Sequence, residues 1–95
     1  MLTRKLYNNG QIIIPKKVTK LLGIEDGYVL SIYHIKDTIV IEKDHKDKYL
    51  NQATLYNGNL TIPSELRKLL KMDGEALLEM EVCTNRNKIY LKKIA

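Results

Sequence analysis

The sequence lacks residues on which several classes of protein depend. Its 95 residues include one cysteine, Cys83, two prolines, no tryptophan and no phenylalanine. A single cysteine cannot form an intrachain disulfide or build a cysteine-based metal site. The core must therefore come from isoleucine, leucine and valine, with tyrosine at its margins, and the many β-branched residues favour strands.

We also expect no targeting or membrane-spanning segment. The first ten residues, "MLTRKLYNNG", contain no apolar region of signal-peptide type, and no apolar run approaches the length of a membrane span. We therefore expect a cytoplasmic protein that makes no membrane contact. The lone cysteine is compatible with a reducing compartment.

Little in the sequence indicates catalysis. His34 and His45 are eleven residues apart, with no cysteine or carboxylate at metal-ligand spacing. Ser31 and Ser64 have no base that the sequence positions, and the five glycines are scattered at turn signals rather than gathered in a phosphate-binding loop. We expect no enzymatic activity, no metal and no cofactor. The "DHKD" segment, residues 44–47, is interpreted as solvated charge in a connector.

The chain is basic in both halves. The formal net charge is +5 with a pI near 9.3. Residues 1–47 contain eight Lys or Arg and six Asp or Glu, and residues 48–95 contain eight and five, which gives +2 and +3. No tail carries the excess. Such a balance fits either a soluble basic protein or a surface that attracts phosphate.

A repeat organises the sequence. Residues 7–24, "YNNGQIIIPKKVTKLLGI", are followed by the similar "YNGNLTIPSELRKLLKM" at residues 56–72. Each half alone would be only marginally stable, so we expect one domain, 1–95, built from repeats 1–47 and 48–95. An offset of 48 aligns these pairs: Gly10 with Gly58, Pro15 with Pro63, Tyr7 with Leu55, Ile12 with Leu60, Ile14 with Ile62, Val18 with Leu66, Leu21 with Leu69, Leu22 with Leu70, Leu30 with Leu78, and Ile32 with Met80.

Each half is predicted to contain four strands and one short helix. Asn and Gly mark the first turn, proline ends the second strand and opens the helix, and alternating apolar residues mark the later strands. The helix stripes are Val18, Leu21, Leu22 and Leu66, Leu69, Leu70. Strands are expected at 3–7, 11–15, 28–35, 38–43, 52–57, 60–63, 76–82 and 88–94, helices at 16–22 and 64–70, and a connector at 44–51. Eight short strands and two short helices predict a closed sheet, because each half would expose strand edges that it cannot pair alone.

These features together resemble the AbrB/MazE/SpoVT family of DNA-binding domains. The resemblance is carried by "GQIIIPKKVTKLLGI" at residues 10–24, the following "EDG" turn, "YVLSI" and "TIVIEK". It implies a mostly β swapped-hairpin barrel, here formed as a single-chain pseudo-dimer because both copies lie on one chain. Barrels of RIFT or double-psi type use a similar half-motif and remain the alternative. The second copy departs from the pattern at Lys71, where the family usually has glycine.

The resemblance implies double-stranded DNA as the partner and a role in transcription regulation. In the family, basic residues of the first hairpin and the helix grip DNA. The family often has arginine after the turn glycine, where this chain has Gln11 and Asn59. The two halves should bind DNA unequally, because the second copy has Gln52 and Ala53 where Arg4 and Lys5 would stand. Carried over by position, the contacts are Arg4, Lys5, Asn9, Gln11, Lys16, Lys17, Lys20, Asn59, Arg67, Lys68 and Lys71.

Plainer interpretations stay open. Lysines on a short helix are often a solvated face, and Asn at a hairpin tip is explained by turn chemistry alone. An antitoxin-like or other protein-interaction module on the same barrel is a second hypothesis; such antitoxins usually add a long tail, whereas "KIYLKKIA" reads as a final strand. A scaffold barrel with evenly scattered charge is a third. Self-association and a protein partner are both possible.

Overall fold

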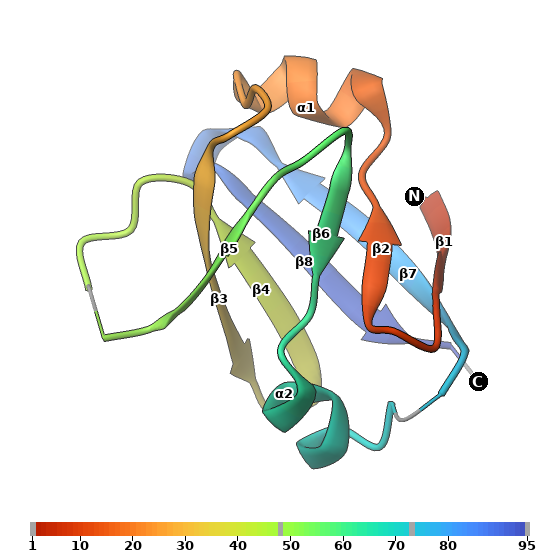
Figure 1. Cartoon of the computed structure of the whole chain (residues 1–95). Coiled ribbons are helices and arrows are strands. Elements are labelled where there is room, and N and C mark those ends of the chain that lie inside the picture. Colours follow the sequence, from red (N-terminus) through yellow and green to blue (C-terminus); the bar gives the residue numbers. More distant parts are fainter. Residues whose placement is uncertain (1, 48, 73, 95) are drawn as a thin grey trace.

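The computed structural model describes residues 2–47, 49–72 and 74–94, and Figure 1 shows the chain. Every strand and helix predicted from the sequence is present, with ends that differ by a few residues. A short 3-10 turn, η1, was not predicted. The elements are β1 (Leu2–Leu6), β2 (Gln11–Ile13), α1 (Lys16–Leu22), β3 (Val29–Ile35), β4 (Thr38–Glu42), β5 (Asn51–Thr54), β6 (Asn59–Thr61), α2 (Ser64–Leu69), β7 (Ala76–Cys83), η1 (Thr84–Arg86) and β8 (Lys88–Lys93).

The strands form one antiparallel sheet that nearly closes on itself. Its order over the described residues is β5-β3-β4-β8-β7-β1-β2-β6. The strands at the two ends of this order, β5 and β6, are consecutive in the chain, and an isolated bridge, Tyr56–Asn59, lies at the turn between them. The expected mostly β barrel with two short helices is therefore confirmed, in an arrangement consistent with an AbrB/MazE-type barrel.

The strand registers reveal an internal pseudo-twofold axis. β1 pairs with β7, and β5 pairs with β3. The first strand of each half therefore pairs with the third strand of the other half. β2 pairs with β6 about the Ile12–Leu60 pair, whose members are 48 positions apart. β4 pairs with β8, and the pair at its centre, Val40–Tyr90, is 50 positions apart. Equivalent residues thus face each other at two places in the sheet.

The offset between the halves changes at the turns. Leu6 pairs with Ala76, and the Leu55 N–H donates to the Tyr28 carbonyl at 3.0 Å, so Leu6 corresponds to Leu55. The offset in the first strand is therefore 49, and the alignment of Tyr7 with Leu55 was wrong by one residue. The offset is 48 through the helices. It becomes 50 in the last strands, because the β7–β8 connection is two residues longer than the β3–β4 connection.

Each helix covers one end of the barrel through a narrower stripe than predicted. Val18, Leu22 and Leu66 are buried in the apolar core, and Leu70 packs against it. Leu21 and Leu69 are instead 63% and 59% exposed, which corrects their assignment to the core stripe. A helix of two turns that lies flat on a barrel end presents only its i, i+4 positions to the core.

Both helices end in the same hydrogen-bonded motif. The Ile24 N–H donates to the Thr19 carbonyl at 2.9 Å, and the Met72 N–H donates to the Arg67 carbonyl at 2.6 Å. These bonds are typical of a Schellman C-cap, which needs a left-handed residue. That residue is Gly23 in α1, with φ of 65°, and Lys71 after α2, with φ of 57°.

Candidate nucleic-acid interface

The two helices lie at opposite ends of the β2–β6 strand pair. β2 runs into α1 and β6 runs, in the opposite direction, into α2, so a basic helix stands at each end of this pair (Figure 1). Ile12 and Leu60 point into the core, and adjacent residues of a strand point to the other face. The half-buried Gln11 and Asn59 therefore lie on the outer face between the helices.

The α1 lysines spread over the exposed surface of that helix. Lys16 and Lys20 line a groove beside the β5–β6 turn, whereas Lys17 lies with Leu21 on the side toward β7. All three are exposed, and within the described part of the chain none forms an ion pair. Their charges are therefore available to an external anion.

The basic residues in and just after α2 form more hydrogen bonds within the protein than the α1 lysines do. The Arg67 Nε donates to the Ile62 carbonyl at 3.0 Å, and its guanidinium lies where a side chain on Gly10 would be. Lys68 is exposed, and Lys71 is exposed with its carbonyl accepting the Lys93 ammonium at 2.9 Å. The Arg67 side chain therefore stabilises the fold through this hydrogen bond.

On β1 the structure separates two residues that the sequence grouped. Arg4 pairs with the fully buried Leu78, so it lies on the inward side of the strand, and its Nε donates to the Ile13 carbonyl at 3.1 Å. Lys5 lies on the opposite side, 2.8 Å from the Glu75 carboxylate. The hydrogen bond and charge of Glu75 raise the pKa of Lys5. Arg4 and Lys5 therefore do not form one basic patch.

The hairpin tips are explained by turn chemistry. The Asn9 Oδ1 accepts the Gln11 N–H at 3.1 Å, and the Asn59 Nδ2 donates to the Asn57 carbonyl at 3.4 Å. Asparagine commonly closes turns in this way. Within residues 2–47, 49–72 and 74–94, the remaining amide groups of Asn9 and Gln11 form no hydrogen bond and can reach an external ligand.

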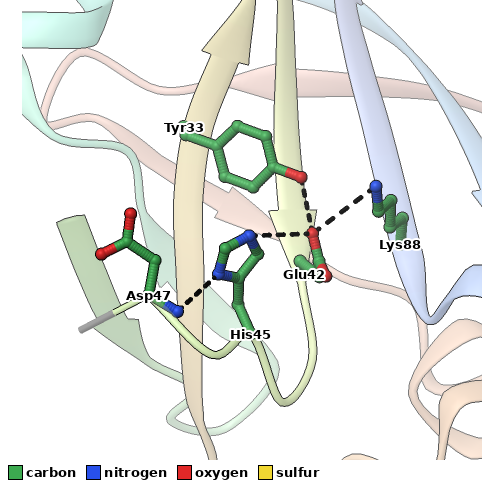
Figure 2. A network of polar contacts seen from close by, with 5 residues as sticks. All are labelled: Tyr33, Glu42, His45, Asp47 and Lys88. Carbon is green, nitrogen blue, oxygen red and sulfur yellow. Dashed lines mark hydrogen bonds and ion pairs between the residues drawn. The ribbon is translucent and has the colours of Figure 1, made fainter. Parts of the chain in front are cut away.

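A polar cluster that the sequence did not predict lies away from these residues (Figure 2). The Tyr33 hydroxyl donates to the Glu42 carboxylate at 2.5 Å, and the Lys88 ammonium lies 3.6 Å from the same oxygen. His45 packs edge-on against Tyr33, and its Nδ1 accepts the Asp47 N–H at 2.9 Å. His45 is thus partly ordered by contacts rather than free in a connector. The signal was absent from the sequence because the five residues come from β3, β4, the connector and β8.

The pKa values in this cluster follow from burial and charge. Burial, followed by the hydrogen bond to Glu42, raises the pKa of Tyr33. The pKa of Lys88 is also raised, because partners including Tyr33 and Glu42 outweigh the opposing effect of burial. Among the described residues, no group of three or more His, Cys, Asp or Glu side chains is arranged to hold a metal ion.

The fold and the strand registers define the class: a nearly closed eight-stranded barrel with two helices, consistent with an AbrB/MazE-type barrel. In the sequence, residues 3–49 match the family model described as "Antidote-toxin recognition MazE, bacterial antitoxin". This part of the chain is therefore similar to the AbrB/MazE-like superfamily. The match covers the first repeat and does not extend over the second. No curated protein matches the chain.

No helix in the described ranges is long and apolar enough to cross a membrane.

Proposed function

We propose that the protein is a cytoplasmic, non-enzymatic transcriptional regulator that binds duplex DNA across the outer face of β2 and β6. The observation that carries the proposal is the placement of α1 and α2, each with exposed lysines, at the two ends of this strand pair. The similarity of residues 3–49 to a family of antitoxins with an AbrB/MazE-like fold supports it.

The size of the molecule fits a short duplex. Its extents are 29 × 28 × 23 Å, and at about 3.4 Å per base pair the longest spans about eight base pairs. A pseudo-twofold protein face also matches the local twofold symmetry of duplex DNA. Phosphate contacts from the helices would fix the register, and Gln11 and Asn59 lie between them, where amides can reach phosphates or base edges.

The two halves contribute unequally to this face. α1 offers Lys16, Lys17 and Lys20 without ion pairs among the described residues, whereas in α2 the Arg67 side chain is hydrogen-bonded to the Ile62 carbonyl. We therefore assign the stronger grip to the α1 half. Arg4, Lys5, Asn9, Lys68 and Lys71 remain predicted contributors.

A salt series of DNA-binding affinity tests the proposal. If about six basic residues contact phosphates, log K should fall against log salt with a slope near −5, from about −0.9 for each contact. Replacing Lys16, Lys17 and Lys20 by Gln should make the slope shallower by about 2.7, since about three contacts are lost. Fluorescence anisotropy with a labelled duplex measures both.

The matched control removes three charges elsewhere. Lys36, Lys46 and Arg86 are exposed, lie outside α1 and α2, and form no ion pair among the residues described. Their replacement by Gln should leave the slope nearly unchanged. If the DNA affinity of the unaltered protein did not depend on salt, or if the two triple variants changed the slope equally, DNA binding by the proposed face would be contradicted.

A second candidate is an antitoxin-like module that binds a protein toxin. It is favoured by the similarity of residues 3–49 to the MazE family, which is a family of antidote-toxin recognition. Affinity purification of the full chain from its own cells would recover a small, stoichiometric protein partner under this alternative. DNA binding with no such partner would favour the first candidate.

We also propose that residues 1–47 and 48–95 are halves of one folding unit. Four strand pairings join the halves in the described sheet: β1–β7, β2–β6, β3–β5 and β4–β8. The halves would then act as the two subunits of an intrachain pseudo-dimer.

A further inference from the structure

A groove opens between α1 and the β5–β6 turn. Its volume is about 660 Å³, and its walls include Ile14, Thr19 and Gly58, with the carboxylates of Glu25 and Asp26 among its lining. This volume lies in the usual range of small-ligand pockets. Neither the proposed DNA face nor the core accounts for a space of this size.

The other half of the molecule shows what fills the equivalent space. The Ile14 N–H donates to the Gly58 carbonyl at 2.8 Å, and the Ile62 N–H donates to the Gly10 carbonyl at the same distance. The two sites therefore share one backbone frame. Next to Gly10, the guanidinium of Arg67 occupies the space, with its Cζ 2.7 Å from the position that a Cβ would take.

The groove exists because Arg67 has no long counterpart in α1. The equivalent residue, 48 positions earlier, is Thr19, which is buried and donates its hydroxyl to the Lys16 carbonyl at 2.9 Å. Beside Gly58 the nearest atom to the position of a Cβ is the Ile14 carbonyl oxygen, at 3.5 Å. The side chain that fills one site is thus absent from the other.

An acceptor is left without a partner at the floor of this groove. In the α2 half the Ile62 carbonyl accepts the Nε of Arg67. In the described ranges, no donor reaches the equivalent Ile14 carbonyl. Because this carbonyl oxygen accepts no hydrogen bond from the described part of the chain, it can accept one from a ligand that brings a donor.

We propose that the groove binds an arginine side chain from a partner polypeptide, in the position that Arg67 takes in the other half. The guanidinium would lie against the Gly58 backbone and donate to the Ile14 carbonyl. Glu25 and Asp26 would supply negative charge for a charge-assisted contact. The rest of the groove leaves room for the residues that flank the arginine.

The part of the groove beside Gly58 disfavours a phosphate ligand, although Lys16 and Lys20 also line the groove. The decisive group is the Ile14 carbonyl, which can accept a hydrogen bond but cannot donate one to a phosphate oxygen. The inference goes beyond DNA binding and does not depend on it.

An NMR titration of the full chain with Nα-acetyl-arginine amide tests the inference. The amide resonances of Gly58 and Lys16 should shift saturably, while Gly10 should not respond because Arg67 already fills its site. The citrulline analogue has the same shape without the charge and should bind about fivefold more weakly. Equal binding of the two probes, no saturable shift at Gly58, or a larger shift there with inorganic phosphate would overturn the proposal.

Two variants sharpen the test. In Thr19→Arg the introduced guanidinium should occupy the groove, donate to the Ile14 carbonyl in a crystal structure and abolish the probe-induced shift at Gly58. An introduced side chain in solvent, with the probe still bound, contradicts the proposal. Glu25→Gln with Asp26→Asn changes exposed residues only and provides a second readout. This variant should bind the arginine probe several-fold more weakly, and unchanged binding would also count against the site.

Discussion

The α1 half and the α2 half share one backbone plan but differ in the side chains placed on it. Each half has the same Schellman cap, the same bond between a turn glycine and the residue before proline, and equivalent buried residues. They differ where Arg67 replaces Thr19, where Lys71 replaces Gly23, and where Tyr33 and Glu42 have Glu81 and Lys92 as counterparts.

The difference separates what the barrel needs from what each half does. The positions of the buried core cluster are apolar in both halves, because one barrel interior must be filled from both sides. Positions on the helices and rims have diverged. One half has a filled groove and an engaged arginine, and the other has an open groove and three unpaired lysines among the described residues.

Separating the halves should have the largest effect. Residues 1–47 contain β1 to β4, of which β1 and β3 lose the neighbours β7 and β5. A segment this short cannot bury a sufficient core, so the isolated monomer should lose its β-sheet signal in circular dichroism completely. Mixing it with residues 48–95 should restore the signal. A monomeric and natively folded 1–47 segment would contradict the proposed folding unit.

Alanine at the two turn glycines should compare the filled and open grooves. Both glycines have positive φ, 85° at Gly10 and 77° at Gly58, so each change should cost about 1–2 kcal/mol of unfolding free energy. Gly10→Ala should cost about 1 kcal/mol more, because the methyl group would move Arg67 from its bond to Ile62. Urea denaturation measures both. Adding Arg67→Ala should erase the extra cost of Gly10→Ala; equal costs of the single variants would refute the contact.

Exchanging the helix C-caps should have a smaller effect. Lys71 has a left-handed φ of 57°, which is unfavourable for a residue with a Cβ, so Lys71→Gly should raise the free energy of unfolding by about 1 kcal/mol. Gly23→Lys should lower it by about the same amount. Thermal denaturation with both variants provides the matched pair. A loss of stability in Lys71→Gly would indicate that the lysine side chain matters more than its backbone strain.

The polar cluster around Glu42 should produce the smallest effect, and only in alkali. The folded-state pKa of Tyr33 is raised above its usual value of 10.0, so the protonated phenol stabilises the fold. That contribution is complete below about pH 10 and is lost as pH rises through the folded-state pKa. The raised pKa of Lys88 acts in the same direction.

Stability measured from pH 8 to 11 should therefore decline less in Tyr33→Phe than in the unaltered protein. Tyr56→Phe is the control, because Tyr56 is 70% exposed and lies outside this cluster. An unchanged alkaline decline in Tyr33→Phe would show that the cluster does not couple to folding.

The sequence predicted the elements well because their signals are local. Asparagine and glycine at turns, proline before each helix and alternating apolar residues located all eight strands and both helices. The changes of the offset between the two halves to 49 and 50 were not predicted. Turn lengths shift this offset, and only the pairing of strands reveals it. The exposure of Leu21 and Leu69 was not predicted, because the spacing of apolar residues in a helix does not show how wide an apolar stripe the barrel can cover.

The candidate site was predictable only as a set of residue types. The basic residues were found by position, yet the inward placement of Arg4 follows from its pairing with Leu78, and the contact of Arg67 with Gly10 joins residues 57 positions apart. The Thr19 groove and the Tyr33–Glu42 bond likewise depend on distant parts of the chain meeting. Such contacts leave no local pattern.

DNA binding by the β2–β6 face can be tested by mapping backbone amide shifts during titration with a short DNA duplex. Resonances of Gln11, Asn59, Lys16, Lys17 and Lys68 should shift together, with larger changes in α1 than in α2. Resonances of Val40 and Tyr90, on the opposite β4–β8 pair, should stay in place. Shifts centred on Val40 and Tyr90, or absent from both helices at saturating duplex, would contradict DNA binding by the β2–β6 face.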